Sequence, residues 1–199
     1  MRHSDDKNFP VVCLGGSAGS VEAYIRILKA LPADCGCGFA IVIVNHMRRT
    51  PTRLPEILSS RTAMPVQLIT TGLSLERDHV YVIPHNRDLT LDDGVFQLAP
   101  LSKPSGFPRV ITVFLKSLAR NWKGQPVAVI LSGLDSDGVE ALRSVKEAGG
   151  ITFAQEPETA PHPDMPDNAI DSGCVDFILP PEGIARELVK IAGAERSKV

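Results

Sequence analysis

The stretch that decides the fold is Pro10–Gly19, with the sequence PVVCLGGSAG. Its first half, Pro10–Leu14, is a short apolar run that ends in glycines, which is typical of a buried strand. The next segment, Val21–Leu31, has apolar residues at helical spacing and stops at Pro32. A strand that runs through a glycine turn into a helix is the repeating unit of an α/β fold.

The same alternation recurs along the chain. Continuous apolar runs such as Phe39–Val44 (FAIVIV) are typical of strands that are buried on both faces of a parallel sheet. We therefore expect one domain with a mostly parallel sheet that is covered by helices on both faces. Further strands are predicted at Pro126–Leu131, Ile151–Ala154 and Val175–Leu179, and further helices at Thr52–Arg61, Val110–Arg120, Val139–Ala148 and Glu182–Ala192.

The middle of the chain has a different pattern, with short apolar runs and turn residues. Asp92-Asp93-Gly94 between two of these runs is a hairpin turn signal. We expect the whole region to form an antiparallel excursion at the sheet edge. Lys103–Arg109 contains two prolines and a glycine and is predicted to be a loop. The short runs are Pro65–Ile69, Val80–Ile83, Leu89–Leu91 and Val95–Leu98.

Composition excludes several classes of protein. The chain has 21 basic and 23 acidic residues, a formal charge of −2, which does not suggest a nucleic-acid partner. It lacks an apolar run long enough to span a membrane, so no membrane insertion is expected. Residues 1–8 are polar and lack the apolar core of a secretory signal, so we expect a flexible start and, by default, a cytoplasmic location. A polar tail is expected at 194–199, which leaves 9–193 as the folded domain.

Four cysteines are present, and no metal site is expected from them. Cys13 and Cys174 lie in apolar, strand-like segments, where a reduced cysteine behaves as a small hydrophobic residue. Cys35 and Cys37 form a single CxC pair, whereas a structural zinc site needs four ligands. We interpret all four as structural or incidental thiols in a reducing compartment.

Polar residues follow three of the predicted parallel strands, at the edge where such sheets bind ligands. Ser17 follows the first strand and His46 follows FAIVIV. Asp135 and Asp137 both lie in the loop Ser132–Gly138 after PVAVIL. A serine hydroxyl, a histidine base and a carboxylate that orients the histidine are the groups that acyl transfer requires. The residues alone do not choose between Asp135 and Asp137.

The glycines around Ser17 support its interpretation as a nucleophile, although the same pattern has an alternative interpretation. Gly15-x-Ser17-x-Gly19 matches the GxSxG elbow, in which a serine projects from a sharp strand-to-helix turn. The alternative is a phosphate-binding loop, but the glycine order is not GxGxxG and no Walker lysine follows. His46 could equally be an ordinary loop residue. Four other histidines are present, at His3, His79, His85 and His162.

At these same residues the chain resembles the CheB-type protein-glutamate methylesterases of bacterial chemotaxis. The resemblance runs from about Phe9 to Ala192, and the segments from the middle of the chain look most similar to the esterase part of proteins that fuse this domain to a receptor methyltransferase. The motifs that carry it are LGGSAGS, VIVNHM, VILSGLDSDG, GGITFAQEPETA and MPDNAIDSGCVDFILPP.

The resemblance implies a three-layer α/β/α fold around a largely parallel, seven-stranded sheet. It places Ser17 on the family nucleophile, His46 on the base and Asp137 on the acid, and it implies no metal and no organic cofactor. The implied reaction is hydrolysis of glutamate γ-methyl esters on chemoreceptors, with deamidation of some receptor glutamines. We expect the backbone N–H groups of Ala18 and Leu134 to hold the oxyanion. The alternative is a catalytically silent interaction module that has kept the fold.

The chain departs from the family pattern at several positions, which puts substrate choice in doubt. Ala18 stands where many members have threonine, and Ser20 replaces a glycine. Leu134 replaces a methionine or threonine. Thr112 replaces a common aspartate, a change expected to weaken a loop near the site, and Asp88 stands where many members have histidine.

Partners and regulation follow from the resemblance as well. Family members usually carry a phosphorylatable receiver domain or a methyltransferase domain, so we expect any such partner on another chain and no phosphorylation-gated control within this one. Arg48, Arg49 and Arg53 lie just after His46. Because chemoreceptor methylation segments are glutamate-rich helices, we expect Arg48 and Arg49 to contact the substrate. The alternative is a solvated arginine loop.

Overall fold

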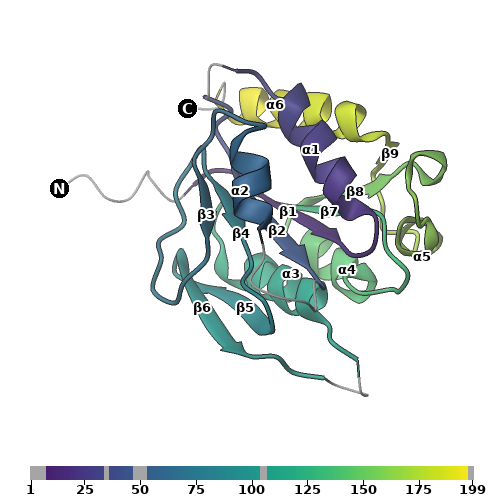
Figure 1. The fold of residues 1–199 in the computed structure, drawn as a ribbon, viewed down its shortest axis with the longest axis horizontal. Coiled ribbons are helices and arrows are strands. Elements are labelled where there is room, and N and C mark those ends of the chain that lie inside the picture. The colour runs from purple at the N-terminus through teal and green to yellow at the C-terminus, as the bar shows by residue number, and fades with distance from the viewer. Residues whose placement is uncertain (1–7, 34–35, 47–52, 104–106, 197–199) are drawn as a thin grey trace.

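A seven-stranded parallel sheet with the order β3-β4-β2-β1-β7-β8-β9 forms the middle of the protein (Figure 1). The computed structural model describes residues 8–33, 36–46, 53–103 and 107–196, with only the backbone of 195 and 196. The predicted parallel sheet is confirmed, because every pair of neighbours in it is parallel. The strands are β1 (Val11–Gly16), β2 (Ala40–Asn45), β3 (Val66–Leu68), β4 (Val80–Val82), β7 (Pro126–Ile130), β8 (Ile151–Gln155) and β9 (Phe177–Leu179).

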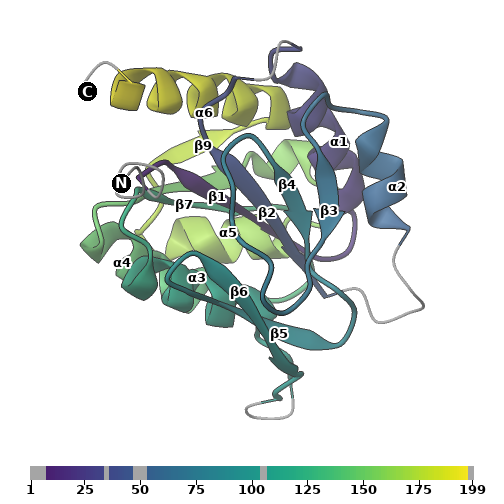
Figure 2. The same ribbon diagram turned by 90° about the vertical axis from the view of Figure 1, so that its left-hand side faces the viewer.

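Helices cover both faces of the sheet, as the three-layer prediction requires (Figures 1 and 2). One face is covered by α1 (Ser20–Ala30), α2 (Leu54–Ser59) and α6 (Pro181–Arg196). The other is covered by α3 (Val110–Asn121), α4 (Val139–Glu147) and α5 (Asp164–Asp171). The predicted polar tail at 194–199 begins within α6. No helix in the described part of the chain is long and apolar enough to cross a membrane.

A hairpin, β5 (Arg87–Asp92) and β6 (Val95–Pro100), forms a separate antiparallel sheet beside α3. Its turn residues Asp93 and Gly94 both have positive φ, 43° and 77°, which is the backbone of a two-residue type I′ turn. The hairpin prediction is therefore confirmed. The expectation that the whole middle region is antiparallel is wrong, because β3 and β4 join the main sheet in parallel.

One helix, α5, was not predicted, and neither was the short 3₁₀ helix η2 (Pro157–Thr159). The α5 sequence DMPDNAID has a proline at its third position and three aspartates, so its apolar spacing is weak. Met165, Pro166 and Ala169 are nevertheless buried against the rest of the protein. Tertiary packing, rather than intrinsic propensity, therefore stabilises this helix.

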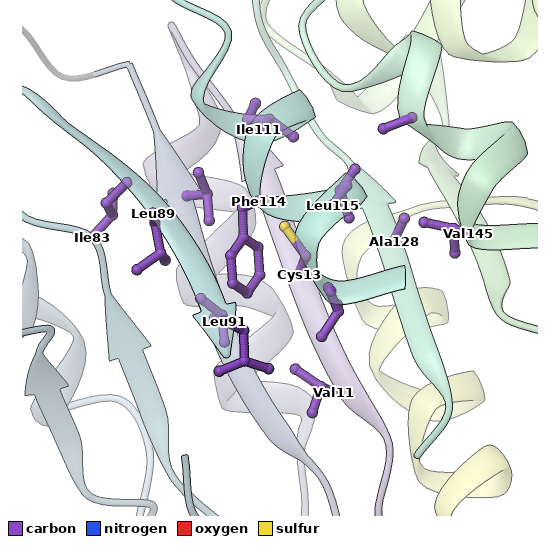
Figure 3. Close-up of a cluster of buried hydrophobic side chains, with 14 of the residues drawn as sticks. Val11, Cys13, Ile83, Leu89, Leu91, Ile111, Phe114, Leu115, Ala128 and Val145 are labelled. Atoms are coloured by element: carbon purple, nitrogen blue, oxygen red, sulfur yellow. The ribbon is translucent and has the colours of Figure 1, made fainter. Parts of the chain in front are cut away.

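The core consists of two apolar clusters, one on each face of the sheet, as alternate strand residues point to opposite faces. On β1, Val11 and Cys13 point toward α3, whereas Val12 and Leu14 point toward α1. Figure 3 shows the first cluster, in which Phe114 lies between the hairpin leucines and Cys13. Cys13 and Cys174 carry free thiols and Cys37 is buried; Cys35 lies outside the described residues.

Phe114→Ala tests whether this cluster carries the stability of the fold. Phe114 is fully buried, so its removal should lower the free energy of unfolding by about 3–5 kcal/mol. Phe107→Ala is the matched control, because that ring is 72% exposed and its loss should change stability by less than about 0.5 kcal/mol. Urea unfolding measures both, and similar losses in the two variants would contradict this packing.

Candidate active site

The ends of three adjacent strands place the predicted serine, histidine and aspartate side by side. In the register of the sheet, Gly16 at the end of β1 pairs with Asn45 at the end of β2, so Ser17 and His46 are the next residues on neighbouring strands. On the other side of β1, Ser17 N–H donates to the Ser132 carbonyl, 2.9 Å away, just beyond β7. The sheet grows from β1 toward β2 on one side and toward β7 on the other. Open α/β sheets bind ligands at the carboxyl ends of the strands at such a change of direction.

Ser17 lies on a sharp turn between β1 and α1. Gly19, the residue before α1, has φ 78°, a left-handed conformation that favours glycine. A Cβ at Gly19 would also lie 2.7 Å from Ser132 Oγ, which donates to the Ala18 carbonyl. The Ser20 hydroxyl donates to the Ser17 carbonyl at 2.7 Å. These contacts fix the Ser17 backbone while its side chain stays partly exposed.

Asp137 is a buried carboxylate held by the start of α3. Its Oδ2 accepts the Ile111 N–H at 2.8 Å and its Oδ1 accepts the Thr112 N–H at 2.9 Å. Its side chain is only 2% exposed. Free N–H groups in the first turn of a helix favour a negative charge, so α3 stabilises Asp137 as an anion.

His46 bridges two carboxylates. Its Nε2 lies 2.6 Å from Asp137 Oδ2, and its Nδ1 lies 3.0 Å from Asp135 Oδ2. Burial alone would lower the pKa of His46, but the hydrogen bonds to Asp135 and Asp137 outweigh it and raise the pKa to about 9. In this arrangement the imidazole is therefore protonated at neutral pH.

Asp135 differs from Asp137 in its surroundings, because its side chain is 45% exposed. Its Oδ1 accepts the Asp137 N–H at 2.8 Å. Burial would raise the pKa of Asp135, but the hydrogen bonds from His46 and from the Asp137 N–H, with the charges of His46 and Arg109, lower it. Both aspartates left open by the sequence pattern thus contact His46, one buried and one at the surface.

The other predicted site residues are distributed as follows. No hydrogen bond joins Ser17 to His46 within the described residues. Ala18 is partly exposed and Leu134 is 62% exposed, and neither backbone N–H donates a hydrogen bond in the described part of the chain. Arg48 and Arg49 lie outside the described residues.

Sequence reasoning missed the groups that hold the acid loop. Thr112 is 4% exposed, and its Oγ1 accepts the Gly138 N–H at 2.8 Å. The buried Gln155 Oε1 accepts the Ser132 N–H at 3.1 Å. The Gly133 carbonyl accepts the Met165 N–H at 3.0 Å, which ties the loop to α5. Thr112 had a signal in the sequence, as a departure from the family aspartate. Its hydroxyl helps to hold the loop, and the expected weakening relative to an aspartate stays a prediction.

A small pocket opens beside His46. Arg87 of the hairpin lines it, and so does Pro108 from the segment before α3. The hairpin therefore contributes to one wall of the site, beside a histidine whose side chain is 10% exposed. The lining residues are Asn45, His46, Pro84, Asn86, Arg87, Leu101, Pro108 and Val110.

Comparison with known proteins identifies the family and the fold. The family model for "CheB methylesterase" matches residues 12–188, which is most of the chain. The chain belongs to the CheB methylesterase family. The crystal structure of the Thermotoga maritima CheB methylesterase catalytic domain has the same fold, with a TM-score of 0.82 and 29% sequence identity, over 92% of this chain and 98% of that one.

Curated relatives in the CheB family support the same assignment. Protein-glutamate methylesterase/protein-glutamine glutaminase 1 of Syntrophus aciditrophicus is 34% identical over 196 residues, which cover 94% of this chain and 54% of that protein. A putative methylesterase/glutaminase of Leptospira interrogans is 30% identical, over 92% of this chain and 95% of that protein. The chain thus spans about half the length of the first relative and nearly all of the second.

Thr112→Val tests the support of the acid loop. The substitution keeps the size of the side chain and the Thr112 N–H but leaves the buried Gly138 N–H without its acceptor. The free energy of unfolding should fall by about 1–3 kcal/mol. Thr112→Ser, which keeps the hydroxyl, should retain most of the stability. Equal stability of the valine variant and the wild type in urea unfolding would show that this hydrogen bond does not hold the loop.

Proposed function

We propose that this chain is a protein-glutamate methylesterase that hydrolyses glutamate γ-methyl esters on chemoreceptors, with Ser17 as nucleophile, His46 as base and Asp137 as acid. The observation that carries the proposal is the buried Asp137 carboxylate 2.6 Å from His46 Nε2, beside a serine on the adjacent strand end. The names of both relatives supply protein glutamate methyl esters as the substrate class and add deamidation of protein glutamine.

In the proposed reaction, the Ser17 hydroxyl oxygen attacks the ester carbonyl carbon and His46 takes the hydroxyl proton. The tetrahedral intermediate then expels methoxide, which leaves as methanol with the proton from His46. Water, activated by His46, hydrolyses the acyl-Ser17 ester and releases the receptor glutamate. Asp137 stabilises the imidazolium at both stages. Deamidation would follow the same course with ammonia as the leaving group.

The oxyanion is best held by the Ala18 and Leu134 N–H groups. Two neighbouring N–H groups are already used: Ser17 N–H donates to Ser132, and Gly133 N–H donates to His162 at 3.0 Å. Ala18 directly follows the nucleophile, the position that supplies an oxyanion N–H in other serine hydrolases with this type of elbow. Each such donor typically contributes about 3–4 kcal/mol to lowering the barrier.

A second candidate function is a silent interaction module. The observation that favours it is the engagement of both His46 nitrogens by carboxylates, which leaves none for Ser17. The complete set of serine, histidine and aspartate at one sheet edge favours the enzyme.

Methanol release from methylated chemoreceptor membranes distinguishes the two. The wild type should release methanol, and Ser17→Ala should lose at least about a thousand-fold in rate because the nucleophile is gone. Ser60→Ala is the matched control and should retain full activity, because Ser60 is an exposed serine directly after α2. No release by the wild type would favour the silent module, and equal release by Ser17→Ala would exclude Ser17 as nucleophile.

The receptor partner is proposed to dock through Arg48 and Arg49, since the acidic methylation helices would be attracted to a basic rim. Replacing both arginines with glutamate should lower kcat/KM for the receptor and reverse its dependence on ionic strength. Hydrolysis of a small neutral ester should be unaffected. Unchanged receptor kinetics and salt dependence would favour a solvated loop. Because the proposed substrates are the cytoplasmic helices of chemoreceptors, the reaction is proposed to take place in the cytoplasm.

A further inference from the structure

Both ring nitrogens of His46 lie within hydrogen-bond distance of an aspartate oxygen. A neutral imidazole has one N–H and can donate only one hydrogen bond, whereas His46 faces an aspartate oxygen at both nitrogens. Both contacts are satisfied together only by the imidazolium. An imidazolium has no lone pair, so in this arrangement His46 cannot accept the Ser17 proton.

The two aspartates are not equivalent. Asp137 is 2% exposed and is fixed by two backbone N–H groups of α3, so it cannot leave the ring. Asp135 is 45% exposed, and its contact with His46 competes with water. Exposed ion pairs are weak, so release of Asp135 is easy. The nitrogen that Asp137 leaves available is Nδ1, and Asp135 occupies it.

We propose that Asp135 is a positioning residue that competes with Ser17 for His46 Nδ1, and that Asp135 must release this atom before the site becomes active. The inference deepens the proposed methylesterase function and rests on it. Substrate docking or rising pH would drive the release, since either one weakens the attraction between the imidazolium and the exposed carboxylate.

The other titratable and charged groups near His46 do not replace Asp135 as a partner of the ring. Arg109 acts on Asp135 but also pairs with Glu140, which in turn pairs with Lys116. Arg87 lines the pocket beside His46. Burial, with the charge of Asp137, raises the pKa of the Cys13 thiol far above neutrality, so the thiol stays uncharged. Within the described residues, Asp135 is thus the exposed carboxylate whose removal acts most directly on His46.

An NMR titration of the His46 ring tests the contact without requiring esterase activity. In Asp135→Asn the pKa of His46 should fall by at least about one unit, because one of its two carboxylate partners is gone. Asp167→Asn, an exposed aspartate on α5, is the matched control and should leave the pKa unchanged. An unchanged pKa in Asp135→Asn would overturn the proposal.

The rate of Ser17 labelling by a fluorophosphonate tests the competition. In this reaction the Ser17 oxygen bonds to phosphorus, fluoride leaves and the proton passes to His46. In Asp135→Asn the acid limb of the pH–rate profile should move to lower pH by about one unit, with labelling near pH 7 up to about ten-fold faster. Slower labelling at every pH would overturn the proposal. If the wild type is not labelled at all, the proposed function fails and the NMR titration alone decides the role of Asp135.

Discussion

The hydrogen bonds from the first turn of α3 to the Asp137 carboxylate are the interaction on which the site depends. A carboxylate that is 2% exposed is costly unless its oxygens are paired, and here the Ile111 and Thr112 N–H groups pair one each. The same helix end needs an acceptor for those N–H groups. One contact therefore caps a helix, stabilises a buried charge and fixes the oxygen that bonds His46.

The sheet supplies the second constraint. Since β2, β1 and β7 are adjacent and parallel, their carboxyl ends lie at one edge, and the chain turns into α1 and α4 from that edge. Gly138, the residue before α4, has φ 91° and packs so closely against Ile111 that a Cβ would lie 2.7 Å from the Ile111 side chain. The packing of α3 against α4 thus places Asp137, from the loop after β7, beside His46, which follows β2 on the other side of β1. The two apolar clusters stabilise the fold that holds this arrangement.

The sequence was sufficient to predict the strands and helices that have clear periodicity and the residues that follow the parallel strands. FAIVIV and PVAVIL are continuous apolar runs, which are typical of strands buried on both faces of a sheet. The rule that ligands bind at strand ends then grouped Ser17, His46 and the Ser132–Gly138 loop. The direction of β3 and β4 was not predictable, because three-residue strands carry no information on their partners. Helix α5 was missed because its stability comes from tertiary packing.

The contact of Asp135 with His46 was also beyond the sequence, since it depends on the conformation of one exposed loop. The pattern left two aspartates as alternatives, and the structure brings both to the ring. The most direct test of the central claim, that Asp137 acts through His46 on Ser17, is peptide mapping by mass spectrometry after fluorophosphonate labelling. The account predicts one adduct, on Ser17, which forms about a hundred-fold or more slowly in Asp137→Asn. An adduct elsewhere, or an equal rate in the variant, would contradict it.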